Sequence, residues 1–265
     1  MRLRSSLFLL AALGFTLVSA APAELVRRDA EAESVAEGVP LRRLLARQAL
    51  ASATCNLAAA QMPVGKFSDP FCNMQPPIDT RPAPTPLPSP ASGLVLTHVA
   101  IGRGTQNYTC ANNSAQATPA PVGALASLFN ATCLAAPFPQ LLNTMPGIAL
   151  EFPVPDSSDP NSPANIFLSG HHYFSDLTTA VFNLNTTLHD WGSVACKKNS
   201  SSSAPNPSMD VPWLKLTSKS ASGCTISEVY RLNTAGGLPP ATCAGQQSNI
   251  QVQYSAEYWF WAQPS

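Results

Sequence analysis

The segment Ile250-Gln-Val-Gln-Tyr-Ser-Ala-Glu-Tyr-Trp-Phe-Trp-Ala262 decides the fold class of this chain. Successive side chains of an extended strand point to opposite faces. One face of this segment would carry Ile250, Val252, Tyr254, Ala256, Tyr258 and Phe260, and the other would carry Gln251, Gln253, Ser255, Glu257, Trp259 and Trp261. The alternation predicts a strand with one face in the core, while its second face mixes polar groups with two indoles.

Similar strand patterns recur toward the N-terminus, and helical periodicity is nearly absent. Clusters of Gly, Pro, Asn and Ser separate the segments. The predicted strands are 94–101, 106–110, 122–129, 148–152, 172–174, 181–184, 213–219, 225–233 and 250–262. Short strands separated by turn-forming residues are typical of an antiparallel β-sandwich or a closed barrel, so we expect an all-β fold.

Four regions follow one another along the chain. Residues 1–20 combine two arginines, an apolar run and a small-residue ending, which is the pattern of a signal peptide. Residues 21–50 contain the pairs Arg27-Arg28 and Arg42-Arg43 and are expected to form a propeptide or a disordered tail. Residues 51–92 are rich in proline and predict an extended linker or a strap over the domain. The β-rich domain is expected at 93–265.

An export signal places the seven cysteines in an oxidising compartment, where disulfides form. We favour Cys110 with Cys133, because both end neighbouring predicted strands, and Cys196 with Cys224 is a second hypothesis. No C-x-x-C motif occurs, so no metal site is expected. Export also makes five N-x-Ser/Thr triplets potential glycan acceptors, at Asn107, Asn112, Asn130, Asn185 and Asn199.

Charge excludes two classes of partner. From residue 51 onward the chain holds eight basic and ten acidic residues. Nucleic acid and anionic membranes both attract clustered positive charge, so we expect neither nucleic acid nor a membrane as a partner.

Five blocks, in this order, carry a resemblance to a known family. They are Leu96-Thr-His-Val-Ala-Ile-Gly-Arg-Gly-Thr-Gln-Asn-Tyr-Thr-Cys110, His172-Tyr-Phe174, Val211-Pro-Trp-Leu-Lys-Leu-Thr-Ser-Lys219, Ser227-Glu-Val-Tyr-Arg-Leu-Asn-Thr-Ala-Gly-Gly237 and Tyr254-Ser-Ala-Glu-Tyr-Trp-Phe260. From Gly93 onward the chain resembles the secreted, mainly fungal family called domain of unknown function 3455. The resemblance implies a β-rich fold and secretion, and it implies no established activity.

Members of that family are often labelled malate dehydrogenase, and the residues do not support this name. A dinucleotide site needs G-x-G-x-x-G between a strand and a helix, so that helix N–H groups meet the pyrophosphate. The segment Gly102-Arg-Gly104-Thr-Gln-Asn107 has only the first two glycines, and no helical pattern follows it. We therefore expect no cofactor.

A buried ion pair is the first candidate site. Glu228 shares a strand face with apolar residues, and a buried carboxylate must be paired or protonated. Arg103 is the expected cation, with Tyr230 or Tyr258 as a hydroxyl donor. A structural pair that fixes strand register is the alternative to a functional one.

Outward-facing tryptophans suggest a second candidate. Trp213, Trp259 and Trp261 alternate with polar residues and could stack on sugar rings. The alternative buries them under the proline-rich strap or a second sheet. The expected partner is an extracellular carbohydrate or another small ligand.

An extracellular enzyme, for example a metal-assisted hydrolase, is the alternative function. It would place His98 or His172 next to a carboxylate in an open pocket. No catalytic residue is assigned. Taken together, the candidate ligand-binding residues are His98, Arg103, Gln106, His172, Trp213, Glu228, Arg231, Glu257 and Trp259.

Overall fold

The computed structural model describes residues 55–64, 85–156, 163–220 and 226–264. The predicted signal peptide and propeptide, together with Cys72 and Cys224, lie outside the described residues. Within the described part, no helix is long and apolar enough to cross a membrane.

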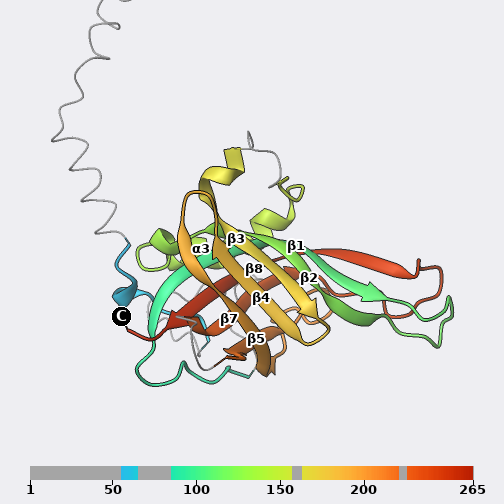
Figure 1. The fold of residues 1–265 in the computed structure, drawn as a ribbon. Helices are drawn as coiled ribbons and strands as arrows, with labels where there is room; N and C mark the ends of the chain where they lie inside the picture. Colours follow the sequence, from blue (N-terminus) through green and yellow to red (C-terminus); the bar gives the residue numbers. More distant parts are fainter. Residues whose placement is uncertain (1–54, 65–84, 157–162, 221–225, 265) are drawn as a thin grey trace, which may run out of the picture. The chain divides into compact units, whose positions relative to one another are not determined.

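Eight antiparallel strands form a closed barrel, in which each strand pairs with its neighbours in the chain and β8 returns to β1 (Figure 1). The strands are β1 (Val95–Thr109), β2 (Ala120–Asn130), β3 (Leu168–Asp176), β4 (Thr179–Asn185), β5 (Asp190–Ser202), β6 (Trp213–Ser218), β7 (Ile226–Gly236) and β8 (Asn249–Ala262). Closure gives every strand two hydrogen-bonded neighbours. The all-β prediction is confirmed, in its barrel form.

Two strand predictions differ from the structure in detail. The expected strands 94–101 and 106–110 are one continuous strand, β1. Gly102 and Gly104 lie inside it, and a Cβ on Gly104 would come within 1.9 Å of the Leu125 carbonyl oxygen. The glycines allow the strands to approach closely, so the G-x-G pattern serves packing in a strand and forms no phosphate loop.

The strand periodicity also missed β5, whose second half is mostly Lys, Asn and Ser.

The predicted strand 148–152 is wrong, because residues up to Leu150 belong to α3 (Pro139–Leu150). Pro139 stands in the first turn, where a missing N–H is harmless. Pro146 lies inside the helix and Gly147 follows it, and both residue types lower helix propensity. These two residues conceal the helical pattern. The helix packs on β1, β7 and β8 and buries Leu142, Asn143 and Pro146.

The barrel has an inner and an outer apolar cluster, and both include residues of β8. Tyr258 and Phe260 point inward and pack with Phe182 and Leu128. Trp259 points outward and packs with residues of β1, β6 and β7 and with Leu87 from the segment before β1. Both faces of β8 are therefore buried along the part that α3 and residues 85–91 cover.

Residues 85–91 are held on the barrel by an ion pair and its neighbours. Lys215 Nζ lies 3.1 Å from Glu228 Oε1 and donates to the Ser89 carbonyl at 2.7 Å. The Tyr230 hydroxyl donates to the Pro88 carbonyl at 2.7 Å, and the Ala91 N–H donates to Glu228 at 3.3 Å. The partner of Glu228 is therefore Lys215, and the predicted pairing with Arg103 is wrong.

Two disulfides join described residues. Cys55 pairs with Cys133, and Cys110 pairs with Cys243. Cys110 and Cys133 are both bonded, but their predicted mutual pairing is wrong: β1 and β8 run side by side, so Cys110 at the end of β1 meets the loop before β8. Cys224 is outside the described residues, so the pairing of Cys196 with Cys224 remains a prediction.

Candidate functional site

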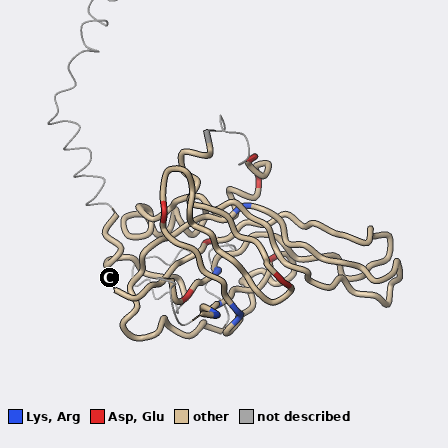
Figure 2. Tube along the Cα trace, in the orientation of Figure 1, with Lys and Arg blue, Asp and Glu red and all other residues tan. Residues whose placement is uncertain are grey.

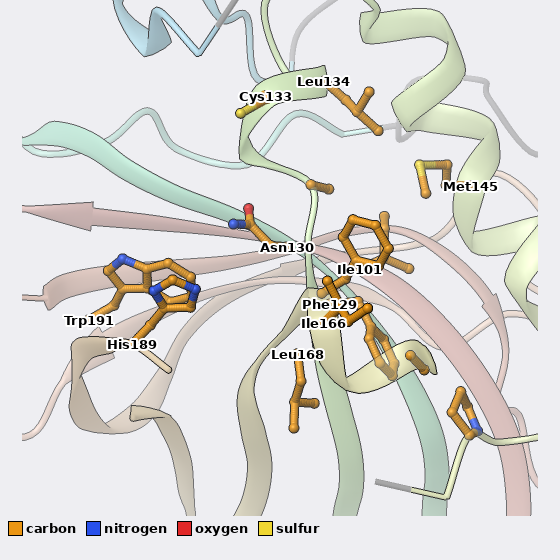
Figure 3. A pocket seen from close by; sticks show the side chains of 14 residues that line it. Ile101, Phe129, Asn130, Cys133, Leu134, Met145, Ile166, Leu168, His189 and Trp191 are labelled. Atoms are coloured by element: carbon orange, nitrogen blue, oxygen red, sulfur yellow. The ribbon is translucent and has the colours of Figure 1, made fainter. Parts of the chain in front are cut away.

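An apolar pocket of about 630 Å³ lies on the outer side of β1 and β2 (Figure 3). Its walls come from β1, β2, η3 (Thr132–Leu134), α3, η4 (Pro163–Phe167) and the first residues of β3 and β5. It is lined by Ile101, Phe129, Asn130, Ala131, Cys133, Leu134, Met145, Pro155, Ala164, Ile166, Phe167, Leu168, His189 and Trp191. The volume and the apolar lining are typical of sites for small molecules.

Trp191 and His189 lie together on one side of this pocket, and Met145 lies across from them (Figure 3). The Trp191 indole stacks on the His189 ring with centroids 4.4 Å apart and on the His98 ring with centroids 4.5 Å apart. Stacking holds the half-buried indole in place. The stacked indole is therefore a fixed aromatic part of the pocket wall.

His98 is buried and fixed by two hydroxyls. Its Nε2 lies 2.8 Å from Ser169 Oγ, and its Nδ1 lies 3.0 Å from Thr132 Oγ1. Burial, with the nearby His189 ring as a second cause, lowers the pKa of His98 to about 4. The ring is thus neutral at physiological pH and supports the wall beneath Trp191.

The Ser169–His98 pair has the spacing of a nucleophile and its base, but its surroundings do not suit that role. Ser169 exposes none of its surface. A hydroxyl, Thr132, stands where a carboxylate would orient the base, and the low pKa makes His98 a weak base. The pair therefore serves to fix the position of His98.

A smaller cavity of about 420 Å³ adjoins the other side of this wall. His98, Asp190 and Trp191 line it, together with Val95 and Ala262 at the end of the barrel. Trp191 therefore separates two spaces, of which the first is the more apolar.

Three predicted residues lie in the polar part of the barrel interior. His172 stacks on Phe182 with centroids 4.3 Å apart and hydrogen-bonds the Val181 carbonyl at 2.9 Å. Burial lowers the pKa of His172 to about 4. Arg231 donates to the Pro212 carbonyl at 2.8 Å, and Gln106 is also buried. The hydrogen bonds of His98 and His172 go to hydroxyls and to a backbone carbonyl, and the ion pair of Glu228 is with Lys215.

Arg103 holds the end of α3, and Glu257 is linked to the helix through Asn233, which also bonds Asn143. Arg103 donates to the carbonyls of Ala149 at 3.0 Å and Phe152 at 2.8 Å, at the C-terminal end of the helix. Such a cation satisfies carbonyls that have no partner within a helix. Glu257 is fully buried and accepts bonds from Asn233 at 2.7 Å and Trp259 at 2.8 Å. Burial raises the pKa of Glu257 to about 7.

Two of the three predicted outer tryptophans, Trp213 and Trp259, are buried, whereas Trp261 is half-buried. Trp213 is 0% exposed and Trp259 is 1% exposed, and both pack in the outer cluster with Leu87. The alternative interpretation, burial beneath the strap, describes their position. Among the described residues, no group of three His, Cys, Asp or Glu side chains has the arrangement of a metal site.

The predicted residues are thus spread over five places: the pocket wall, the barrel interior, the contacts near α3, the outer cluster and the ion pair with Lys215. The pocket itself was not predicted. Residues from seven separate elements line it, and no spacing along the chain connects them. One signal was available: Ile166-Phe167-Leu168 is an apolar run between a segment rich in Pro, Ser and Asn and a predicted strand. An apolar run in such a loop must be covered by the fold or by a partner.

The family comparison agrees with the extent of the barrel. A family model described as "Protein of unknown function (DUF3455)" matches residues 90–262. No curated protein and no solved structure matches the chain. The matched residues cover well over half of the chain and extend from just before β1 to the last residue of β8. The chain therefore belongs to the DUF3455 family of proteins of unknown function.

Proposed function

We propose that this chain is an exported binding protein for a small, uncharged and largely apolar molecule, which occupies the pocket beside Trp191. The observation that carries the proposal is the lining of that pocket. Asn130 and His189 are the hydrogen-bonding polar side chains among its lining residues, apart from the indole N–H. A ligand would gain mainly by removing apolar surface from water, at about 25 cal/mol per Å².

The same lining favours an apolar ligand over a sugar. A bound sugar needs several convergent polar groups for its hydroxyls, in addition to an aromatic surface. The pocket offers the aromatic surface and few of the polar groups. We therefore prefer the small-ligand form of the binding hypothesis to its carbohydrate form.

Two disulfides support export, because such bonds persist in oxidising compartments. The side chains of Asn112, Asn130, Asn185 and Asn199 are exposed and accessible for glycan attachment. Asn107 is half-buried in β1 and accepts a hydrogen bond from Thr105 at 2.9 Å. We propose that Asn112, Asn185 and Asn199 carry glycans, because Asn130 lines the ligand pocket and a glycan on it would block the pocket.

Titration of the full-length protein with the uncharged fluorophore N-phenyl-1-naphthylamine tests the binding function. We expect one saturable site, because the pocket excludes water around the dye. Ala164→Trp, which fills the pocket from η4, should abolish binding. Leu177→Ser is the control, since Leu177 is exposed and is not among the pocket residues. Equal dye binding by wild type and Ala164→Trp would refute the proposal, and saturable binding to a glycan array instead would favour the carbohydrate form.

A further inference from the structure

The exposed face of α3 carries an apolar stripe, which we call the α3 apolar face. It consists of Leu141, Met145 and Ile148 in the helix, together with Phe138 just before it and Phe152 just after it, at alternating spacings of three and four residues. Such spacing places side chains on one side of a helix. Four of them are about half exposed: Phe138 at 54%, Leu141 at 49%, Ile148 at 50% and Phe152 at 63%. The adjacent side of the helix, with Leu142, Asn143 and Pro146, is buried against the barrel.

The α3 apolar face is continuous with the pocket. Met145 belongs to the stripe and also lines the pocket. Across the pocket, η4 presents Ile166 at 70% exposure and Phe167 at 62% exposure. The apolar lining therefore continues out of the pocket onto an apolar surface on both sides. Contiguous exposed apolar surface of this kind marks an interaction site.

The charge around this surface defines the partner. No Lys or Arg occurs between Arg103 and Lys197, a span that includes α3, η4 and most pocket residues. Figure 2 shows how few charged positions the described chain has. The charged groups nearest in sequence to the stripe are the carboxylates Glu151 and Asp156. An anionic surface would gain nothing here, because its attraction depends on basic residues.

We propose that the α3 apolar face and the rim residues Ile166 and Phe167 dock on an uncharged lipid surface. This proposal rests on the proposed function and deepens it, since such a surface is a source of apolar ligands, and Met145, Ile166 and Phe167 belong both to the docking surface and to the pocket lining. A second copy of the chain on the same face would instead cover the pocket. The sequence-based expectation excluded membranes for want of basic residues, and that reason applies to anionic lipids only.

Sedimentation of the full-length protein with phosphatidylcholine vesicles tests the docking. We expect binding that is equal with vesicles that also contain phosphatidylserine, and that is unchanged between low and high salt. The double variant Ile148→Ser, Phe152→Ser should bind the vesicles with an affinity at least about 10-fold lower than that of wild type. Leu177→Ser, an equally exposed change away from the stripe, should bind as wild type does.

The two proposals fail separately. Ile148 and Phe152 do not line the pocket, so the double variant should keep its affinity for the dye in solution. Trp191→Ala should lose dye affinity and keep vesicle binding. Vesicle binding that requires phosphatidylserine and disappears in salt would overturn the docking proposal, as would no binding at all. A dimer in sedimentation equilibrium that the double variant abolishes would also overturn it, because the face would then belong to a second copy.

Discussion

Trp191 stacks on His98 with ring centroids 4.5 Å apart and ring planes inclined by 30°. One indole thus forms a wall of the apolar pocket and covers a buried imidazole at the end of the barrel. The hydroxyls of Ser169 and Thr132 hold that imidazole. The shape of the pocket therefore depends on groups that do not line it.

Removal of the indole should change the titration of His98. Burial lowers the pKa of His98 to about 4, and Trp191 provides part of that burial. In Trp191→Ala we expect the pKa to rise toward its ordinary value of about 6.5, because water reaches the ring. Imidazole proton shifts in an NMR titration measure this change. His172, which stacks on Phe182 inside the barrel, should keep its pKa. If the pKa of His98 were the same in Trp191→Ala as in wild type, groups other than Trp191 would be burying the ring.

Buried histidines should make the protein sensitive to acid. Burial lowers the pKa of His172 to about 4, so between that value and about 6.5 the unfolded chain binds a proton that the folded chain does not. The contribution of His172 to the free energy of unfolding is fully present above pH 6.5. As the pH is lowered toward 4, it decreases by on the order of 3 kcal/mol.

His172→Phe removes this titration and keeps an aromatic ring against Phe182. We expect a free energy of unfolding that is about 1 kcal/mol lower at pH 7, for the lost hydrogen bond, and a smaller loss between pH 6.5 and 4. Urea unfolding at several pH values measures both. If the free energy of unfolding changed with pH in the same way in wild type and His172→Phe, His172 would not be a source of the acid sensitivity.

Glu257 should have the opposite effect. Burial raises its pKa from 4.5 to about 7, so the folded state binds the extra proton in that window. Stability from this group is complete below pH 4.5 and falls as pH rises to 7, by on the order of 3 kcal/mol. In Glu257→Gln this fall is absent, so the stability difference between wild type and variant should shrink from pH 4.5 to pH 7. The pH dependence of stability that the buried histidines cause is the same in both proteins, so it cancels in the difference. A constant difference would show that Glu257 does not titrate in this range.

The two disulfides should differ in their effect on the pocket. Each closes a long loop, with sequence separations of 78 and 133 residues, so loss of either should lower stability by about 4–5 kcal/mol in the chain-entropy picture. Cys133 lines the pocket, whereas Cys110 and Cys243 do not. Cys55→Ser with Cys133→Ser should weaken dye binding as well as stability. Cys110→Ser with Cys243→Ser should lower the melting temperature and leave dye affinity unchanged in the folded protein.

The ion pair of Lys215 and Glu228 should hold residues 85–91 on the barrel. Both side chains are more than nine-tenths buried. Lys215→Met leaves a buried carboxylate without its cation, and we expect a loss of about 3 kcal/mol. The added change Glu228→Leu should recover part of this loss, because it removes the unpaired charge. Urea unfolding of both variants tests the coupling. If the second change made the protein still less stable, the carboxylate would matter for reasons other than its charge pair.

The sequence by itself determined the class of fold. Alternation in residues 250–262 and turn-forming residues between short apolar segments predict antiparallel strands, because the pleat repeats every two residues whatever surrounds it. The same local signals showed that the spacing of Gly102 and Gly104 does not suit a dinucleotide site, and the structure showed that these glycines allow close backbone approach.

Only the tertiary structure decided which faces are buried, which cysteines meet and where the pocket lies. Trp259 and Trp213 alternate with polar residues, as exposed side chains do, yet they are buried because α3 and residues 85–91 add a second layer outside the barrel. Cys110 meets Cys243 because closure of the barrel brings β8 back to β1. The pocket joins Met145, Ile166 and Trp191 from segments far apart in the chain. Periodicity reports only neighbours within one element, so contacts between elements have no signature in it.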